Sequence, residues 1–524
     1  MNLLKSTGII GGMTLISRIF GFARDMMLSR LLGASAVGDA WQLAFQLPNI
    51  FRRLFAEGAF SAAFVPLFNR KAAEDGSSSN AAAQRFSNEV LSVFIPILLV
   101  FSAIMIAIMP WVIWLIDDFG AGGRTNATSI SLARITFPYL GLISIMTLFA
   151  AILNSISKFA AAAFAPVLLN ICMITAMLVA IAADGGSNPE QTAMMLAWSV
   201  SFAGIIQMLW LWYWAHRAGF RFRLQRPGFT PDVRELGVLI LPAVFGAGIY
   251  QISRFIDLFF LGRLEEGSFV FLALADRLNQ LPLGIIGIAL GTAILPALSR
   301  FIAQNDAGGA QRVQSNAIEL GLLLTVPAAV GLFCAAQPLV SAFYFGGKFG
   351  TDDVTNTAAV VAMLVIGLPA YVLVKVLTPG FFARKDTKTP VYTAGVSLAI
   401  NIALNLSLIP LMGVAGLALA GALAAWANCI MLYAILHRRD QFTIEPDLFV
   451  RIGRILLSAA AMGGVIWFLA PYGNAYYGAG VAARISSILV LVGSGAIVYF
   501  GLAWVTGAID RSKIAMLTRK QAAN

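Results

Sequence analysis

Residues 91–116 read LSVFIPILLVFSAIMIAIMPWVIWLI, a run of twenty-six residues without a charged side chain. About 20 apolar residues in a helix are enough to cross the roughly 30 Å hydrocarbon core of a bilayer. A helix that is apolar on every side also has no face that suits water. The stretch therefore predicts a transmembrane helix.

Similar runs recur along the whole chain, and the composition agrees with them. The 524 residues are 59% hydrophobic and 12% charged, whereas soluble proteins carry about 25% charged residues. Fourteen segments are predicted to span the membrane: 8–30, 40–66, 90–116, 132–153, 162–183, 192–214, 235–261, 268–298, 315–336, 355–380, 391–411, 414–436, 451–470 and 482–507. The expected fold is an all-α polytopic membrane protein with fourteen transmembrane helices.

The Lys and Arg residues between these segments indicate how the helices are oriented. With a cytoplasmic N-terminus, twenty-three of the 36 fall on the cytoplasmic side and six on the opposite side. Cytoplasmic loops generally carry this excess, so both termini are expected in the cytoplasm. Nucleic acid is excluded as a partner of this +11 chain, because the basic residues lie in separate short loops and not on one continuous face.

Several motifs recur at an offset of about 231–234 residues. Gln46-Leu47-Pro48 matches Gln280-Leu281-Pro282, Pro138 matches Pro369, and Asn170 matches Asn401. A repeat of six helices keeps the same orientation in both copies, which predicts two parallel lobes with a substrate site between them. The expected domains are an N-lobe over residues 1–228, a C-lobe over 229–440, and two extra helices with a cytoplasmic tail over 441–524.

Charged residues inside the predicted spans point to the function. Each costs about 2.5–3.5 kcal/mol at the centre of a transmembrane helix, and such residues usually line a wet cavity. Seven are cationic and five are anionic: Arg18, Arg24, Arg52, Arg53, Arg254, Arg277 and Lys375, with Asp25, Asp39, Glu57, Asp257 and Asp276. Some can pair within one helix, as Arg53 and Glu57 can at a spacing of four. If every acid is paired, two positive charges remain, which favours a cationic cavity over structural pairing alone.

Arginine suits a cavity that binds an anion. It keeps its charge when desolvated, and its planar guanidinium binds phosphate or carboxylate through two hydrogen bonds. The sequence has no GxxxxGK[ST] motif and no nucleophile–base arrangement, and its two histidines, His216 and His437, lie at the ends of predicted loops. A transporter is therefore expected, and not an enzyme.

The sequence resembles the MurJ (MviN) lipid II flippases of bacterial peptidoglycan synthesis, which belong to the multidrug/oligosaccharidyl-lipid/polysaccharide exporter superfamily. The matching stretches run in order along most of the chain: SRIFGFARD (17–25), DAWQLAFQLPNIFRRLFAEGAFSAAFVP (39–66), FAPVLLNI (164–171), ADRLNQLPLGIIGIALGTAILPALS (275–299), FYFGGKF (343–349) and KVLTPGFFARKDTKTP (375–390). The resemblance implies a monomeric flippase of the bacterial inner membrane. Its substrate would be lipid II, an undecaprenyl pyrophosphate bearing a disaccharide-pentapeptide, carried from the cytoplasmic to the periplasmic leaflet.

The resemblance also implies particular site residues. The substrate-binding set is Arg18, Arg24, Arg52 and Arg277, with Asp39 and Glu57 at acidic positions of the family motifs. Asp25, Arg53 and Lys375 are the supporting charges of the cavity. Some family members hold a cation, which implies a Na⁺ site at Asp257, Asn401 and Asn405. Asn405 stands where some members have a carboxylate, and Arg254 repels a cation, so both weaken this expectation.

The energy source follows from the charge of the substrate. Moving a net anion out of a negative interior gains about 2.3 kcal/mol per charge per 100 mV, so transport by membrane potential needs no ATPase or required cofactor. Three alternatives stay open. They are a flippase for another polyprenyl-linked glycan, a drug/cation antiporter, which should have an acidic cavity, and a non-transporting scaffold for cell-wall synthesis proteins.

Overall fold

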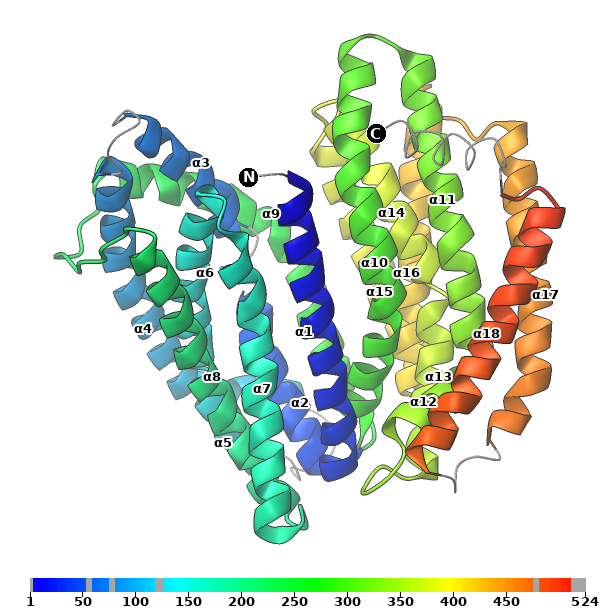
Figure 1. The fold of residues 1–524 in the computed structure, drawn as a ribbon, viewed down its shortest axis with the longest axis horizontal. Helices are drawn as coiled ribbons and strands as arrows, with labels where there is room; N and C mark the ends of the chain where they lie inside the picture. The colour runs from blue at the N-terminus through cyan, green and yellow to red at the C-terminus, as the bar shows by residue number, and fades with distance from the viewer. Residues whose placement is uncertain (1–2, 53–58, 75–80, 118–125, 475–479, 510–524) are drawn as a thin grey trace. The chain divides into compact units, whose positions relative to one another are not determined.

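The structure is a computed structural model of the whole chain, and its described residues are almost entirely helical (Figure 1). They are residues 3–52, 59–74, 81–117, 126–474 and 480–509. Among them, β-structure is limited to an isolated bridge between Gly346 and Phe349. The all-α fold predicted from the sequence is therefore confirmed.

The chain forms two compact units. Unit 1 comprises Met1–Val270 with Gly346–Phe349, and unit 2 comprises Phe271–Phe345 with Gly350–Asn524. The helices of unit 1 are α1 (Leu3–Leu32), α2 (Ala36–Arg52), α3 (Ala59–Glu74), α4 (Ala81–Asp117), α5 (Asn126–Thr136), α6 (Tyr139–Ser155), α7 (Phe159–Asp184), α8 (Pro189–Arg217) and α9 (Pro231–Leu261). Helix α10 (Ser268–Ala303) starts in unit 1 and continues in unit 2. Unit 2 also contains α11 (Ala307–Cys334), α12 (Ala336–Tyr344), α13 (Thr351–Val365), α14 (Leu368–Phe382), α15 (Lys388–Met412), α16 (Val414–Arg438), α17 (Pro446–Asn474) and α18 (Val481–Val505).

Eleven helical stretches of the described chain are long and apolar enough to cross a membrane. The three other predicted spans, 8–30, 40–66 and 235–261, fall on α1, on α2 with α3, and on α9. Within the predicted span 40–66, residues 53–58, which include Arg53 and Glu57, lie outside the described residues. A polytopic membrane protein is confirmed, whereas the count of fourteen stays a prediction.

Two prolines divide predicted spans into paired segments. Pro138 caps the N-terminus of α6 directly after α5 ends, and Pro369 lies in the first turn of α14 directly after α13 ends. Proline has no N–H to continue a helix and clashes with the preceding turn. Each pair nevertheless forms one continuous candidate span, Ala127–Ser155 and Thr351–Phe382.

Phenylalanine rings dominate the core of unit 1 where α3 packs on α4. Phe60 stacks on Phe94 with ring centroids 5.1 Å apart, and Phe64 stacks on Phe86 at 5.3 Å. Aromatic pairs of this kind contribute about 0.5–1.5 kcal/mol beyond burial of their area. Because lipid is as apolar as these side chains, close packing holds the helices together more than exclusion from water does.

Helix α9 packs against α2, α3 and α4 within unit 1. The grouping of α9 with unit 1 reflects packing, whereas the predicted boundary at residue 228 reflects the sequence repeat. The lobe boundaries at residues 228 and 440 therefore stay predictions.

Residues Gly346–Phe349 fit tightly against the C-terminal end of α1 in unit 1. The N–H of Lys348 donates to the carbonyl of Arg30 at 2.9 Å, and its Nζ donates to the carbonyl of Ser187 at 3.0 Å. Gly347 has a φ of 58° and no room for a side chain, because a Cβ there would overlap the Arg30 carbonyl. The FGGKF part of the motif thus needs glycine for both backbone conformation and close approach.

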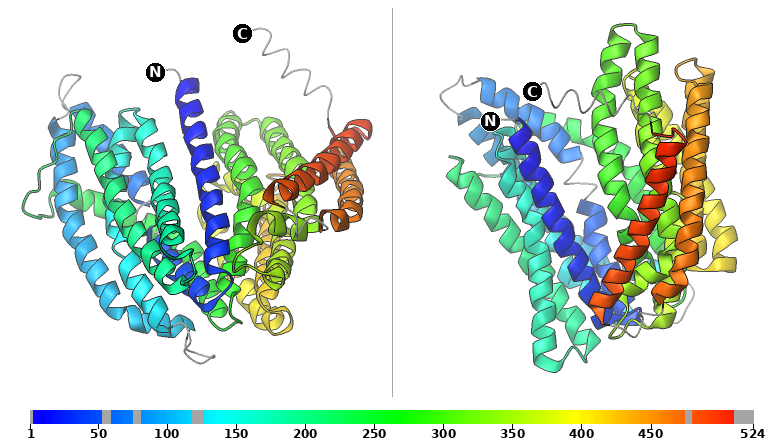
Figure 2. Two further views of the ribbon diagram at one scale, coloured as in Figure 1. Left: turned by 60° about the horizontal axis from the view of Figure 1, so that its bottom comes forward. Right: turned by 45° about the vertical axis from the view of Figure 1, so that its right-hand side comes forward.

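In unit 2, α17 and α18 lie side by side and are attached to α11 (Figure 2). Arg451 on α17 donates to both carboxylate oxygens of the buried Glu319 on α11, at 3.0 and 3.2 Å. The hydroxyl of Tyr499 on α18 donates to the Leu323 carbonyl at 2.7 Å. These two contacts fix both C-terminal helices to the same neighbour.

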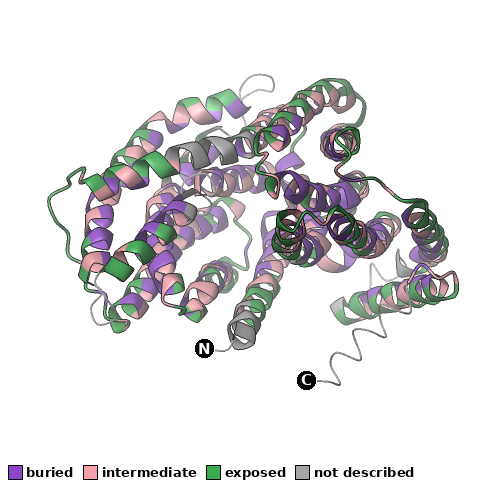
Figure 3. Ribbon diagram, turned by 90° about the horizontal axis from the view of Figure 1, so that it is seen from above, coloured by how far each residue is buried: buried purple, intermediate pink, exposed green. Residues whose placement is uncertain are grey.

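Burial within each unit follows the pattern of a protein in lipid. Buried positions concentrate where helices face one another, and exposed positions cover the outer sides of the helices (Figure 3). Many exposed side chains are large and apolar, including Trp111, Trp198 and Trp467 at 61–74% exposure. A soluble protein rarely leaves so much apolar surface uncovered.

Candidate substrate site

Arg24 is the centre of a buried polar cluster in unit 1. It is 6% exposed. Its Nε and Nη2 donate to one oxygen of Asp25 at 2.9 and 2.6 Å, and its Nη1 donates to the amide oxygen of Asn170 at 3.1 Å. The guanidinium also lies 5.5 Å from the centre of the Phe45 ring. One arginine of α1 therefore connects α1 with α7 and α2.

Asn170 fixes the geometry of this cluster from α7. Its amide nitrogen donates to the carbonyl of Ser17 on α1 at 3.1 Å. Gly21 lies against the same amide, and a Cβ at that position would be 3.5 Å from the amide nitrogen. An alanine at this position would make an ordinary van der Waals contact with the amide, so α1 and α7 pack closely here without requiring glycine.

The cluster neutralises Arg24 with an internal carboxylate. Removing one partner from a buried ion pair typically costs about 3–5 kcal/mol, because the other charge is left uncompensated. A ligand can therefore replace Asp25 at the guanidinium only if it brings negative charge itself. Phosphate oxygens fit this requirement, since they are anionic and arginine can bind them through two N–H groups.

The other predicted residues of α1 and α2 lie at other positions along these helices than Arg24 does. Arg18 is half-buried on α1, seven residues before Asp25, so these two residues share a face of the helix. Arg52 is half-buried at the end of α2, where its Nε donates to Asn49 at 3.2 Å. The predicted roles of Arg53 and Glu57 fall on residues outside those that the structure describes.

Asp39 has structural hydrogen bonds that the sequence analysis did not foresee. Its two carboxylate oxygens accept the N–H groups of Gly267 at 2.7 Å and Val270 at 3.1 Å. Asp39 therefore caps the N-terminus of α10, where free N–H groups and the helix dipole favour an anion. The nearby Glu266 accepts the N–H of Ala36, at the start of α2, at 2.7 Å. Substrate binding by Asp39 stays a prediction.

Unit 2 contains the remaining predicted cavity charges. Arg277 is half-buried on α10, next to Asp276, whose carboxylate accepts a hydrogen bond from Gln280 at 2.5 Å. Lys375 on α14 has an exposed side chain. It passes over Gly287 of α10, where an added Cβ would be 3.1 Å from Nζ. Glycine at this position makes room for the lysine.

The residues of the predicted Na⁺ site are divided between the units. Asp257 is half-buried on α9 of unit 1, whereas Asn401 and Asn405 are buried on α15 of unit 2. Asn405 donates to the amide oxygen of Asn401 at 3.2 Å, and its own amide oxygen is buried with no hydrogen-bond partner among the described residues. An unused buried oxygen suits a cation ligand. The described residues contain no group of three or more His, Cys, Asp or Glu side chains that could hold a metal, so the site stays a prediction.

The family model described as lipid II flippase MurJ matches residues 28–487. The chain belongs to the MurJ family of lipid II flippases. A probable lipid II flippase MurJ of Rhizobium tropici is 38% identical, with all of this chain and 98% of that protein covered. The lipid II flippase MurJ of Burkholderia cenocepacia is 31% identical, with 97% of this chain and 98% of that protein covered.

Solved structures share the fold. A lipid II flippase MurJ in an inward closed conformation superimposes with a TM-score of 0.77 at 24% identity, covering 95% of this chain and 98% of that one. An inward-facing multidrug resistance MATE transporter of the MOP superfamily reaches 0.64 at 14% identity, covering 82% and 97%. These structures show the fold, whereas the family model and the two relatives confirm the MurJ family inferred from the sequence motifs, which is a family of transporters.

Within this MurJ-family chain, sequence reasoning singled out Arg24 and Asp25 but missed the other two partners of Arg24, Asn170 and Phe45. Asn170 was recognised only as a repeated residue, and Phe45 was not singled out. A buried asparagine in an apolar helix is itself a signal, because an amide in a membrane span needs a polar partner. The identity of that partner could not be found from α7 alone.

Proposed function

We propose that this protein moves lipid II from the cytoplasmic to the periplasmic leaflet of the bacterial inner membrane by alternating access. Membership of the MurJ family along nearly the whole chain carries the proposal. The buried Arg24 cluster supports it, because a guanidinium held ready by a carboxylate suits the pyrophosphate of the substrate. The protein acts as a transporter and catalyses no covalent step.

Binding is an exchange of anions at Arg24. Pyrophosphate replaces Asp25 at the guanidinium, so that Arg24 is never left without a counter-charge. Arg18 lies two turns before Asp25 on the same face of α1 and adds positive charge on that side of the helix. Neutral lipids cannot drive the exchange, because they would leave two buried charges apart. Arg52, Arg53, Arg277 and Lys375 add positive potential along the path of the substrate.

The proposed architecture has fourteen transmembrane helices, with two parallel six-helix lobes and α17 and α18 as an addition. Similar proline breaks at Pro138 and Pro369 support the repeat, as do the prolines inside α2 and α10, Pro48 and Pro282. Both termini are cytoplasmic in this proposal. A substrate site between the lobes then opens to each side in turn.

The membrane potential drives transport in this proposal. An interior-negative potential favours outward movement of an anion by about 2.3 kcal/mol per charge per 100 mV. A Na⁺ bound by Asp257, Asn401 and Asn405 would add a coupling ion, with Asn405 supplying a neutral amide oxygen. The protein works as a monomer, near the cell-wall synthesis proteins that use its product.

Complementation tests the proposal. A bacterial strain depleted of its own lipid II flippase would receive the wild type, Arg24→Ala, Arg52→Ala, Arg277→Ala, or the control Arg438→Ala at an exposed position at the end of α16. We expect growth with the wild type and the control, and lysis with the three cavity variants, all at equal membrane levels. Failure of the wild type would contradict lipid II as the substrate and favour another polyprenyl-linked glycan. Growth with every variant would favour a scaffold.

A further inference from the structure

Residues 219–230, here called the strap, connect α8 to α9 without forming a helix. Three side chains spaced four residues apart on α4 form hydrogen bonds with the backbone of every second strap residue. The side-chain amide of Gln84 accepts from the N–H of Arg221 at 2.8 Å and donates to its carbonyl at 2.6 Å. Asn88 accepts from the N–H of Arg223 at 3.2 Å, and the Ser92 hydroxyl accepts from the N–H of Gln225 at 2.9 Å. Four residues of helix rise about 6.0 Å, and two extended residues span about 6.6 Å. The two spacings agree, so the strap runs along α4 in a fixed register.

This register divides the side chains of residues 220–223 into two sets, and the side chains from Leu224 to Phe229 are all exposed. Phe220 is buried, and Phe222 packs on Phe149 with ring centroids 4.6 Å apart. Arg221 and Arg223 alternate with these rings and are exposed. Side chains of an extended chain point alternately to opposite sides, so the α4 contacts force the arginines outward.

No ion pair neutralises the strap arginines in the described residues, and Glu89 on α4, an acid in contact with the strap, accepts from the Thr230 hydroxyl at 2.8 Å. The strap contains no Asp or Glu. The neighbouring acids on α9 are engaged from α3: Glu235 pairs with Arg70 at 2.6 Å, and Asp232 pairs with Lys71 at 3.1 Å. In the described part of the chain, no ion pair joins Arg221, Arg223 or Arg226 to an acidic side chain.

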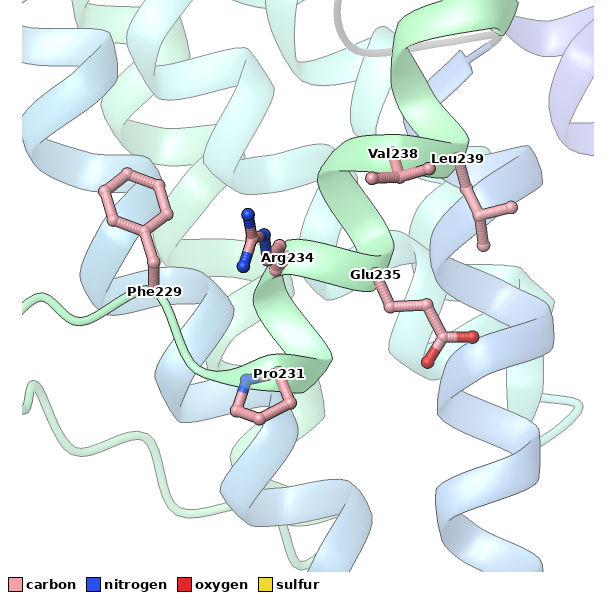
Figure 4. A pocket seen from close by; sticks show the side chains of 6 residues that line it. All are labelled: Phe229, Pro231, Arg234, Glu235, Val238 and Leu239. Carbon is pink, nitrogen blue, oxygen red and sulfur yellow. The ribbon is translucent and has the colours of Figure 1, made fainter.

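A pocket of about 490 Å³ lies where the strap meets α9. It is lined by Phe229, Pro231, Arg234, Glu235, Val238 and Leu239 (Figure 4). The guanidinium of Arg234 lies on the same side of α9 as the Phe229 ring, whereas the Glu235 carboxylate points away from it (Figure 4). Phe229 is 79% exposed and Val238 is 65% exposed. The pocket therefore offers an apolar wall beside a cation.

The strap also follows directly on a candidate membrane span, which places it next to a membrane surface in the proposed architecture. That span is α8, which ends at Arg217. Exposed Trp212 and Tyr213 precede that end, as expected for the aromatic belt at a lipid headgroup layer. Leu224 within the strap is exposed as well. The arginines can interact with the charged headgroup of a lipid, and the exposed apolar side chains beside them can contact its acyl chains.

We propose that the strap and the adjoining pocket bind an anionic glycerophospholipid of the surrounding bilayer. The lipid phosphate interacts with Arg221, Arg223, Arg226 and Arg234, and an acyl chain lies against Phe229 and Val238 in the pocket. A protein partner would not require apolar side chains at the lipid boundary. This site is separate from the Arg24 cluster and does not depend on transport of lipid II.

Lipid titration of the purified full-length protein, followed by native mass spectrometry, tests this site. Phosphatidylglycerol should bind more tightly than phosphatidylcholine, and added salt should weaken it. The triple variant Arg221→Gln/Arg223→Gln/Arg226→Gln should bind phosphatidylglycerol about 100-fold more weakly, or about fivefold per arginine. The matching arginine-to-lysine triple should restore most of the affinity, because it keeps the charge.

A charge-matched control separates a defined site from a general effect of net charge. Lys385→Gln/Lys388→Gln/Arg438→Gln removes three exposed cations from unit 2 and should leave the affinity unchanged. Val238→Trp should weaken binding of long-chain but not short-chain phosphatidylglycerol, because it fills the pocket. Equal losses in both glutamine triples, or equal binding of both phospholipids, would overturn the proposal. The proposal would also be overturned if the glutamine triple variant of the strap lost affinity for an undecaprenyl pyrophosphate probe but not for phosphatidylglycerol. Unchanged thermal unfolding in phosphatidylcholine verifies that each variant is folded.

Discussion

Two buried asparagines, Asn170 in unit 1 and Asn401 in unit 2, are both 6% exposed but have different partners. Asn170 accepts a hydrogen bond from the charged Arg24, which another helix provides. Asn401 accepts from the neutral Asn405, one turn along its own helix. Asn170 therefore joins two helices and orients a guanidinium, whereas Asn401 forms its hydrogen bond within one helix. The same residue type thus orients a charged arginine in one unit and forms a neutral polar pair in the other.

The largest expected effect is at the ion pair beside Asn170. Arg24→Ala leaves Asp25 buried without its counter-charge, so we expect loss of complementation and a decrease of about 3–5 kcal/mol in the free energy of unfolding. Unfolding of the purified protein in detergent measures the second quantity. Arg24→Ala/Asp25→Asn should recover most of the stability but no growth. Recovery of growth by the double variant would show that the cluster is structural only.

The next effect compares the two asparagines directly. Asn170→Ala removes the acceptor of a charged donor and should cost about 1.5–3 kcal/mol, whereas Asn401→Ala removes a neutral hydrogen bond and should cost about 0.5–1.5 kcal/mol. The same unfolding measurement applies to both variants. Equal costs would mean that Arg24 gains nothing from Asn170 beyond an ordinary amide contact.

A smaller effect concerns the unused amide oxygen of Asn405. Asn405→Asp places a carboxylate at this position and should increase stabilisation by Na⁺ relative to choline by about 1 kcal/mol, through preferential binding to the folded state. Thermal unfolding in the two salts at equal ionic strength measures it. Because Asn and Asp have nearly the same shape, the wild type with Asn405 is the control for the effect of charge alone. Identical responses to Na⁺ would argue against a cation site on α15.

The smallest effect lies outside the membrane, at Asp386 between α14 and α15. The Thr389 hydroxyl and N–H and the guanidinium of Arg439 donate to this carboxylate and hold its pKa below the usual value. Because the folded-state pKa is lowered, the stabilisation is present above the unfolded-state value of 3.8 and disappears as the pH falls through the folded-state pKa. Asp386→Asn should therefore melt slightly earlier at neutral pH. The difference should narrow in acid, and a constant difference at all pH values would contradict this origin.

Local sequence patterns predicted the helices well, because apolar length and proline act within one segment. The charge at Arg24 could be recognised in this way, whereas the sequence showed Pro138 and Pro369 only as a repeated pair and did not predict the helix breaks at them. The contacts that give these residues their roles depend on distant positions. Arg24 and Asn170 are 146 residues apart, and Asp39 caps a helix that starts more than two hundred residues later. No periodicity in a single helix encodes such pairs.

The Asp39 cap also has a consequence for biosynthesis. Gly267 is 228 residues downstream of Asp39, so at about 5–20 residues per second a ribosome needs roughly 10–50 s to produce the partner. Throughout that interval the first helices are already inserted, while the start of α2 still lacks its final attachment. Nascent unit 1 therefore lacks this attachment until the first turn of α10 has emerged. A chain truncated before residue 267 should be a preferred target of membrane quality-control proteases.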